Sequence, residues 1–454
     1  MKKILITVSE GSIARNILSS GFLEHFKEDF GPQIFILAPQ EKTEFYKKEF
    51  SSLGAHIIGY SSASLYTFFD RVIFYLIRNC YYTESILSFQ KSRLLVDHNY
   101  FAYLFKRLLV YILGGSALVH KLIRVLAGFR KPAKEILRIF KDIRPDLLFA
   151  SDVQDESDLH AIASARKLGI KVIGMVRSWD NLTNGLVQVV PDLLLVWSPY
   201  IYKIATTLQH FPPKMVKIIG IPQYDWYVRK DIFISREDFL RQVGVDNAKK
   251  LILFAGIGDY LAPHEVEVAE LADEAIKKGE LIFPTNILFR PHPNFTTQRE
   301  KIAALSNVVF DDQVAKYTSA EKTSWEMGGK EIAHLVNSLR HADLVITTAS
   351  TMAIDAVAFA KPVICLAFDG KSKEPYQRSV LRYYRDYTHY KLLSATKGFK
   401  IAYDKNELVK HINDYLKDPT VDKKEREEIK SQFIWKLDGG SIERLAEVLK
   451  QNLD

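Results

Sequence analysis

The strongest constraint on this chain is a regular alternation of short apolar runs with helix-like patterns. In one of these patterns Ala133, Ile136, Leu137 and Phe140 fall at i, i+3, i+4 and i+7, which is one face of a helix. The strand-like runs of the first half lie at 4–8, 34–37, 56–58, 147–150, 172–176, 193–197 and 216–219. This alternation predicts a mostly parallel sheet with helices on both faces.

The same pattern restarts after a loose stretch at 222–250. The strand-like runs of the second half lie at 251–255, before Arg290, at 344–347 and at 363–366, with helix-like patterns at about 263–278 and 331–340. We therefore expect an α/β protein with two doubly wound, Rossmann-like parallel-sheet domains facing a cleft. The boundaries we expect are 1–225 and 226–430, followed by a C-terminal helix within 431–454 that lies far along the chain from either sheet.

Composition narrows the classes of partner. The content of 47% hydrophobic and 26% charged residues is typical of a globular protein. A net charge of +8 favours an anionic partner such as a lipid surface, a nucleotide or a polyanionic acceptor. We expect no nucleic-acid partner, because no recognition module accompanies the charge. Cys80 and Cys365 show no disulfide or zinc spacing, which indicates a reducing cytoplasm.

A basic and aromatic helical region at 66–144 allows two interpretations. Phe, Tyr and Leu alternate there with Lys and Arg, as in helices that lie in the interface of an anionic membrane. The other interpretation is a set of ordinary core helices with solvated basic edges. No run reaches the roughly 18 to 20 apolar residues of a membrane span. The first interpretation predicts a cytoplasmic protein bound peripherally to the inner face of the cell membrane.

Two segments of the second half begin where a predicted strand ends, which is the edge where open α/β sheets bind ligands. Arg290 and His292 follow one strand, and Ser350 and Thr351 follow another and open a helix. We predict that these segments bind the diphosphate of a nucleotide, because they supply a guanidinium, an imidazole, two hydroxyls and the amides at the start of a helix. Taken singly, these residues also fit a rigid turn with a surface histidine and a plain helix cap.

The remaining candidates for donor binding are three glycines and one acid. Gly256 and Gly258 follow a buried strand, where a glycine turn would let a ligand approach the backbone, although a tight turn without function fits equally well. Gly11 follows the first strand of the chain. Asp355 lies one turn into its helix and would either hold a ribose hydroxyl or brace a neighbouring loop.

An acceptor hydroxyl needs a general base, and three carboxylates of the first half lie just past predicted strand ends. They are Glu10, Asp152 and Asp180. Asp152 is preferred, because it leads an acidic cluster at 152–158 in which like charges would raise one pKa toward working pH. The cluster also fits acids that stabilise a helix N-terminus, and Asp180 also fits a turn or cap.

No metal site is expected. The 12 histidines are scattered, and neither H-E-x-x-H nor D-x-D occurs. A cationic cradle would neutralise a diphosphate without a divalent ion. We therefore expect a metal-independent enzyme without a cofactor, for which the nucleotide-activated donor is a substrate.

Five motifs resemble a known family. They are Gly-Ile-Pro-Gln-Tyr-Asp at 220–225, Arg-Pro-His-Pro at 290–293, the run 342–351 with Asp355, Lys-Pro-Val-Ile at 361–364, and Asp-Gly-Gly-Ser-x-x-Arg at 438–444. In this order the motifs resemble the CDP-glycerol glycerophosphotransferases that polymerise teichoic acids, and more broadly the GT-B transferases of surface polysaccharide.

This resemblance implies a GT-B fold and a transfer from a nucleotide-activated donor to a cell-surface glycan or a lipid-linked acceptor. The first half instead carries Ser-Trp-Asp-Asn-Leu-Thr at 178–183, which looks more like sugar transferases. The expected transferred group is therefore a sugar from a nucleotide-sugar donor, and glycerol phosphate is the alternative. A UDP-sugar 2-epimerase and a non-catalytic peripheral membrane scaffold are the alternatives.

Overall fold

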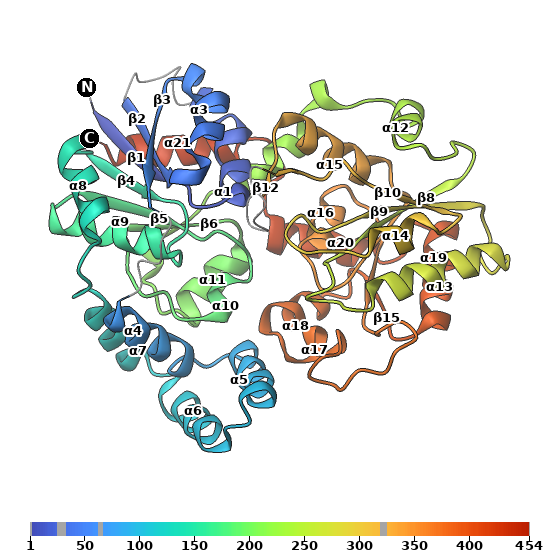
Figure 1. Ribbon diagram of the computed structural model, residues 1–454, viewed down its shortest axis with the longest axis horizontal. Coiled ribbons are helices and arrows are strands. Elements are labelled where there is room, and N and C mark those ends of the chain that lie inside the picture. The colour runs from blue at the N-terminus through green and yellow to red at the C-terminus, as the bar shows by residue number, and fades with distance from the viewer. Residues whose placement is uncertain (1, 25–32, 62–66, 318–324, 454) are drawn as a thin grey trace. The chain divides into compact units, whose positions relative to one another are not determined.

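The computed structural model describes residues 2–24, 33–61, 67–317 and 325–453. The chain forms two compact units (Figure 1). The first unit comprises Met1–Asp225 and Asp438–Asp454, and the second comprises Trp226–Leu437.

The first unit is built on a seven-stranded sheet whose paired strands are all parallel. The strand order is β3-β2-β1-β4-β5-β6-β7. The strands are β1 (Lys3–Thr7), β2 (Gln33–Pro39), β3 (Ala55–Tyr60), β4 (Leu147–Ala150), β5 (Lys171–Met175), β6 (Leu193–Val196) and β7 (Val216–Ile218). The chain turns back between β1 and β4, which makes their carboxyl ends the switch point of the sheet.

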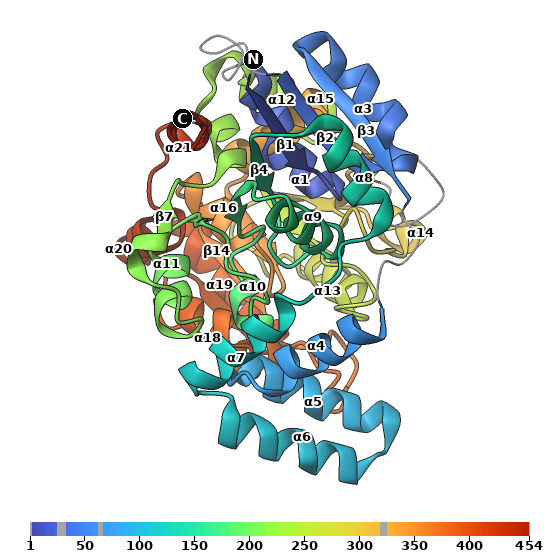
Figure 2. The ribbon, with the colours of Figure 1, turned by 90° about the vertical axis from the view of Figure 1, so that its left-hand side faces the viewer.

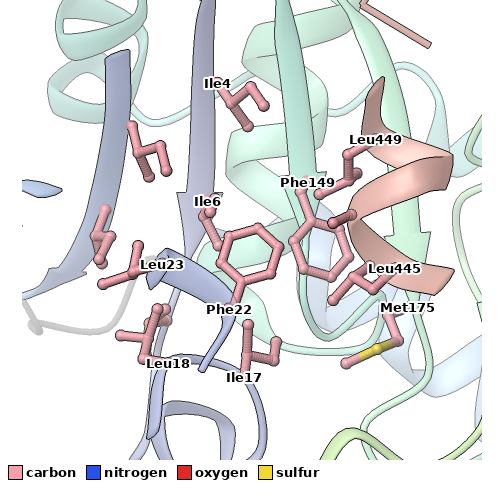
Figure 3. Packing of buried hydrophobic residues seen from close by; sticks show 14 of the residues in the cluster. Ile4, Ile6, Ile17, Leu18, Phe22, Leu23, Phe149, Met175, Leu445 and Leu449 are labelled. Carbon is pink, nitrogen blue, oxygen red and sulfur yellow. The ribbon is translucent and has the colours of Figure 1, made fainter. Parts of the chain in front are cut away.

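Helices cover this sheet, and one of them comes from the far end of the chain. Apart from four helices at 68–127 that form a separate group, the helices are α1 (Gly11–Asn16), α3 (Thr43–Phe50), α8 (Lys134–Ile143), α9 (Glu156–Lys167), α10 (Asn181–Asn184), α11 (Pro199–Thr207) and α21 (Ser441–Gln451). Leu445 and Leu449 of α21 point toward Phe149 of β4 in the core (Figure 3). The C-terminal helix is therefore part of the first unit, whereas the sequence pattern set it apart from both sheets.

Four helices form a separate layer of the first unit, grouped at one of its ends (Figures 1 and 2). They are α4 (Phe68–Asn79), α5 (Glu84–Asp97), α6 (Tyr100–Leu113) and α7 (Ala117–Ala127). A small core that includes Ile73, Tyr81 and Ile123 holds them together. Gly114 lets the end of α6 approach the backbone at Tyr82, since a Cβ there would lie 2.7 Å from the Tyr82 nitrogen.

The second unit repeats the doubly wound plan in a six-stranded sheet of order β10-β9-β8-β13-β14-β15. Its strands, all parallel, are β8 (Lys250–Ala255), β9 (Thr285–Arg290), β10 (Val308–Phe310), β13 (Leu344–Thr347), β14 (Val363–Leu366) and β15 (Lys400–Ala402). The switch point lies between β8 and β13. A separate antiparallel pair joins β11 (Lys316–Tyr317) to β12 (Trp325–Glu326).

The helices of the second unit complete the alternation. They are α12 (Arg236–Val243), α13 (Glu265–Lys277), α14 (Arg299–Ala303), α15 (Gly329–His341), α16 (Met352–Ala358), α17 (Leu381–Asp386), α18 (Thr388–Ser394), α19 (Lys405–Lys417) and α20 (Lys423–Ile429). The predicted fold class of two doubly wound parallel α/β units is confirmed.

Candidate functional site

The carboxyl edge of the first sheet holds an arginine between two acids. Glu10 follows β1, Asp152 follows β4 and Arg177 follows β5, and these three strands are neighbours in the sheet. Arg177 Nη1 lies 2.9 Å from Glu10 Oε1, and Arg177 Nε lies 3.3 Å from Asp152 Oδ2. The switch point of the first unit therefore carries a charged cluster, as its position at a ligand-binding edge would favour.

Asp152 has the environment expected of a general base. Its side chain is only 3% exposed, and the backbone amide of Gln154 donates to its Oδ1 at 3.0 Å. Burial raises the pKa of Asp152 to about 6, with Arg177 opposing the rise and the charges of Asp155 and Glu10 adding to it. A carboxylate with this pKa is mostly ionised at neutral pH and still accepts a proton readily.

The acidic residues that follow β4 have different structural roles. Asp155 caps α9, because its carboxylate accepts from the amides of Ser157 at 2.9 Å and Asp158 at 3.4 Å. Asp158 is buried and accepts from the amide of Asp152 at 2.7 Å. Burial, with Asp155 and Asp152 close by, raises the pKa of Asp158 well above its usual value. The helix-terminus interpretation therefore describes Asp155, whereas Asp152 lies before the helix and faces Arg177.

Asp180 lies close to the same guanidinium. Its carboxylate accepts from Ser178 Oγ at 2.6 Å and from Asn184 Nδ2 at 3.0 Å. Burial lowers the pKa of Arg177, but the charges of Asp152, Glu10 and Asp180 outweigh it and raise that pKa. All three predicted carboxylates thus gather around Arg177, while Gly11 begins α1 beside Glu10.

Sequence reasoning missed Arg177 itself. It stands two residues after β5 ends at Met175, so its position past a strand end was the available signal. A cation surrounded by acids is recognisable only when the order of the strands is known, because β1, β4 and β5 are far apart in the chain.

In the second unit, Glu265 holds the glycine turn after β8. Its carboxylate accepts from the backbone amides of Ile257 at 2.7 Å and Gly258 at 3.0 Å, while the Gly256 amide donates to the Arg290 carbonyl at 2.9 Å. Burial raises the pKa of Glu265 to about 7, although the hydrogen bonds from the two backbone amides lower it. The amides expected to approach a ligand are therefore already paired within the unit.

Glycine at 258 has a steric cause. Its φ is +85°, which side chains rarely adopt, and a Cβ there would lie 2.3 Å from Phe295 Cβ. The turn is therefore closely packed beside the segment that follows β9, and its donor-binding role stays a prediction.

Arg290, the last residue of β9, is buried in an ion pair. Its Nη1 lies 2.8 Å from Asp311 Oδ2, and His334 Nε2 lies 2.9 Å from the other oxygen of Asp311. Burial opposes ionisation of Asp311, but the His334 hydrogen bond and the Arg290 charge lower its pKa to about 2. Arg290 therefore fastens β9 to the segment after β10, which is an internal role that the sequence did not reveal.

His292 is more accessible than Arg290. The amide of Asn294 lies 3.0 Å from His292 Nδ1, and the imidazole lies 4.9 Å from the ring of Phe295 between centroids. The side chain is partly exposed at the carboxyl edge of the sheet, where the prediction of phosphate binding placed it.

The segment after β13 is fixed by a tyrosine. The Ser350 amide donates to Tyr390 Oη at 2.7 Å, and Tyr390 donates in turn to the Ser350 carbonyl oxygen at 2.9 Å. Ser350 Oγ accepts from the amide of Met352 at 3.3 Å, and Thr351 directly precedes α16. Asp355 is buried and accepts from Tyr227 Oη at 2.9 Å, which favours bracing over a contact with ribose.

Two of the family-like motifs bind each other. Asp225 accepts from the amides of Ser441 at 3.1 Å and Ile442 at 2.8 Å, so it caps α21, and Arg444 Nε donates to the Ile219 carbonyl oxygen at 2.8 Å. These motifs therefore attach the last helix to the first unit. No group of three or more His, Cys, Asp or Glu side chains in metal-binding arrangement occurs among the residues that the structure describes.

Comparison with solved structures identifies the fold class. UDP-GlcNAc 2-epimerase from Neisseria meningitidis matches with a TM-score of 0.57 and 10% identity, over 99% of this chain and 100% of that one. A glycosyltransferase from Rickettsia africae matches with a TM-score of 0.53 and 12% identity, over 100% and 99%. S. aureus MnaA with UDP matches with a TM-score of 0.55 and 12% identity, over 100% and 97%. These likenesses establish a fold of the GT-B type.

The family is established by sequence. Residues 159–451 match the model of the CDP-glycerol:poly(glycerophosphate) glycerophosphotransferase family, and the chain belongs to that family. Its function is therefore that of a glycosyltransferase-like transferase, as the motifs predicted. No curated protein sequence matches the chain.

Proposed function

We propose that this enzyme transfers a sugar or a glycerol phosphate from a nucleotide-activated donor to a glycan or lipid-linked acceptor, without a metal ion, at the cytoplasmic face of the membrane. Family membership supports the transfer chemistry. The observation that carries the proposal is the Asp152–Arg177 pair at the switch point of the first sheet, because it combines a buried carboxylate of pKa about 6 with a partly exposed cation.

In this proposal Asp152 removes the proton from the attacking hydroxyl of the acceptor. Arg177 favours the ionised form of the carboxylate, and since the Asp152 side chain is only 3% exposed, the guanidinium would move aside when the acceptor binds. Glu10 is the rival base, since its side chain is 40% exposed and it shares the same guanidinium. Removal of either the base or its partner should slow the chemical step without a comparable loss of nucleotide affinity.

The second unit would bind the donor. His292 and the segment Ser350–Thr351 lie past the carboxyl ends of β9 and β13, where phosphates bind in sheets of this kind. As the bond to the transferred group breaks, fixed hydrogen-bond donors stabilise the charge that builds on the leaving phosphate. Arg290, paired with Asp311, supports the position of this edge instead of contacting the phosphate.

The test is a panel of donors incubated with the purified protein. CDP-glycerol, UDP-GlcNAc and other nucleotide sugars are supplied with and without a membrane fraction or a synthetic lipid-linked acceptor. We expect release of nucleotide that depends on the acceptor, with the transferred group recovered on it. Epimerised nucleotide sugar without acceptor would show a 2-epimerase instead, and nucleotide binding without turnover for every donor would show a non-catalytic scaffold. The Asp152→Asn variant provides the inactive control.

A further inference from the structure

The exposed apolar side chains of this protein are concentrated on one group of helices. Of the 27 large apolar side chains that are exposed in the described part of the chain, 20 lie between positions 68 and 129. These positions belong to α4–α7 and to the short links beside them. Such a concentration marks an interaction surface, because a globular monomer rarely exposes apolar side chains in one continuous patch.

Helices α6 and α7 carry the most exposed part of this patch. On α6 the exposed residues recur at the spacing of one helical face, and Phe101 is 91% exposed, whereas Val110 alone is buried. Leu118 and Leu122 continue the pattern on α7, and Leu118 is 67% exposed. We call this surface the apolar face, defined by Phe101, Leu104, Leu108, Ile112, Leu118 and Leu122.

The link between α4 and α5 is fixed to the rest of the first unit. Tyr81 Oη donates to the Leu182 carbonyl oxygen at 2.7 Å, and Thr83 Oγ1 donates to the Thr183 carbonyl oxygen at 2.8 Å. Both acceptors lie on α10, soon after Arg177. The helices are therefore attached at the carboxyl edge of the first sheet, and their apolar face is turned outward by buried contacts.

Charge identifies the partner as an anionic surface. Residues 67–132 contain ten Lys or Arg against three Asp or Glu. Not all of these cations are available, because Arg124 donates to the Gln209 carbonyl oxygen at 2.6 Å and Arg130 lies 2.6 Å from Asp70 in a buried pair. Lys121 on α7 and Lys131 beyond the end of this helix are exposed, so both are accessible to an external partner.

A basic cavity lies where α7 ends. Its volume is about 350 Å³, and its lining includes Arg130, Lys131, Arg166 and Lys167. Phe129, in the same short link, is 72% exposed. An apolar face with a cationic hollow at its end matches a lipid bilayer, which presents acyl chains below anionic phosphate head groups.

We propose that the apolar face lies in the interface of an anionic bilayer, with Lys121 and Lys131 on the lipid phosphates. No single helix among the described residues is long and apolar enough to cross a membrane, although α6 and α7 together meet that requirement with a bend of 111°. This surface extends the location given in the proposed function, but its test is lipid binding, which is independent of catalysis.

The experiment is flotation of the full-length protein with vesicles of phosphatidylcholine alone or with an equal amount of phosphatidylglycerol, at low and high salt. One variant, Phe101→Ser with Ile112→Ser, changes the apolar face. A second, Lys121→Gln with Lys131→Gln, removes charge. The matched controls are Ile282→Ser with Leu392→Ser, and Lys330→Gln with Lys423→Gln, all exposed in the second unit.

We expect the wild type to bind the anionic vesicles at least tenfold more tightly than the neutral ones. The lysine variant should lose about 25-fold at low salt, since each cation near an anionic bilayer contributes roughly fivefold. The apolar variant should lose at least tenfold at both salt concentrations, and both controls should bind as the wild type does. Wild type that stays unbound on anionic vesicles at low salt would overturn the proposal. Normal binding by the variant Phe101→Ser with Ile112→Ser would also overturn it. A wild-type dimer that this variant converts to a monomer would do the same.

Discussion

Replacing Arg177 by glutamine should move the acid limb of the pH–rate profile upward. Arg177 Nε lies 3.3 Å from Asp152 Oδ2, and its charge opposes the rise that burial imposes on the pKa of Asp152, which is about 6. A cation at this distance holds a carboxylate pKa down by about 1 to 3 units. Without it, the limb should lie between about pH 7 and pH 9, because the base must be ionised to accept a proton.

The size of the effect follows from the ionised fraction. At pH 7, about 90% of Asp152 is ionised when its pKa is about 6, and this falls to between about 50% and 1% at the shifted values. The value of kcat/KM at pH 7 should therefore drop by about 2- to 90-fold and recover as the pH is raised.

The assay is kcat/KM for transfer, measured at limiting acceptor between pH 5 and pH 10. Arg177→Lys keeps the charge and should keep its limb near pH 6, and Arg229→Gln, which breaks an exposed pair with Asp231 in the second unit, is the matched control. A folded Arg177→Gln enzyme with an unmoved limb, or with a loss that high pH does not restore, would refute the role given to this pair.

Further predictions concern the second unit. Arg290→Ala should lower the free energy of unfolding by about 3 to 5 kcal/mol, because Asp311 stays buried without its cation. His292→Ala should instead leave the unfolding midpoint in denaturant near that of wild type and slow transfer about 100-fold. Glu265→Ala should cost about 1 to 3 kcal/mol in the same unfolding experiment, since it leaves the amides of the glycine turn unpaired; an unchanged midpoint would contradict the assignment. The pKa of Asp311 lies below its unfolded value, so the stability it contributes is complete above about pH 4 and is lost as the pH falls toward 2; Asp311→Asn should flatten this part of the acid unfolding curve.

The fold was readable from the sequence because its signals are local. Most predicted strands are short apolar runs buried on both sides, and the run at 147–150 corresponds residue for residue to β4 (Leu147–Ala150). The packing of α21 on the first sheet was not readable, because its attachment depends on Asp225, more than 200 residues earlier in the chain. Distant pairing of this kind leaves no periodic trace in either segment.

The candidate site was readable only in part, for a related reason. Glu10, Asp152 and Asp180 were found by their places past strand ends, but Arg177, which they surround, becomes evident only from the order of the strands. Arg290 was assigned by residue type to a phosphate, whereas its guanidinium is already paired with Asp311. Residue type and position along the chain identify which edge of a sheet is charged, and only the tertiary structure shows which charges satisfy one another.

The most direct test of the proposed function compares Asp152→Asn with wild type in two measurements, the single-turnover rate of transfer and the affinity for the donor nucleotide. We predict a rate about 100- to 10,000-fold lower, with the Kd for the nucleotide within twofold of wild type. Glu10→Gln, assayed beside it, should lose much less. A folded Asp152→Asn protein that transfers at the wild-type rate, with the loss falling on Glu10→Gln instead, would contradict the assignment of Asp152 as the base.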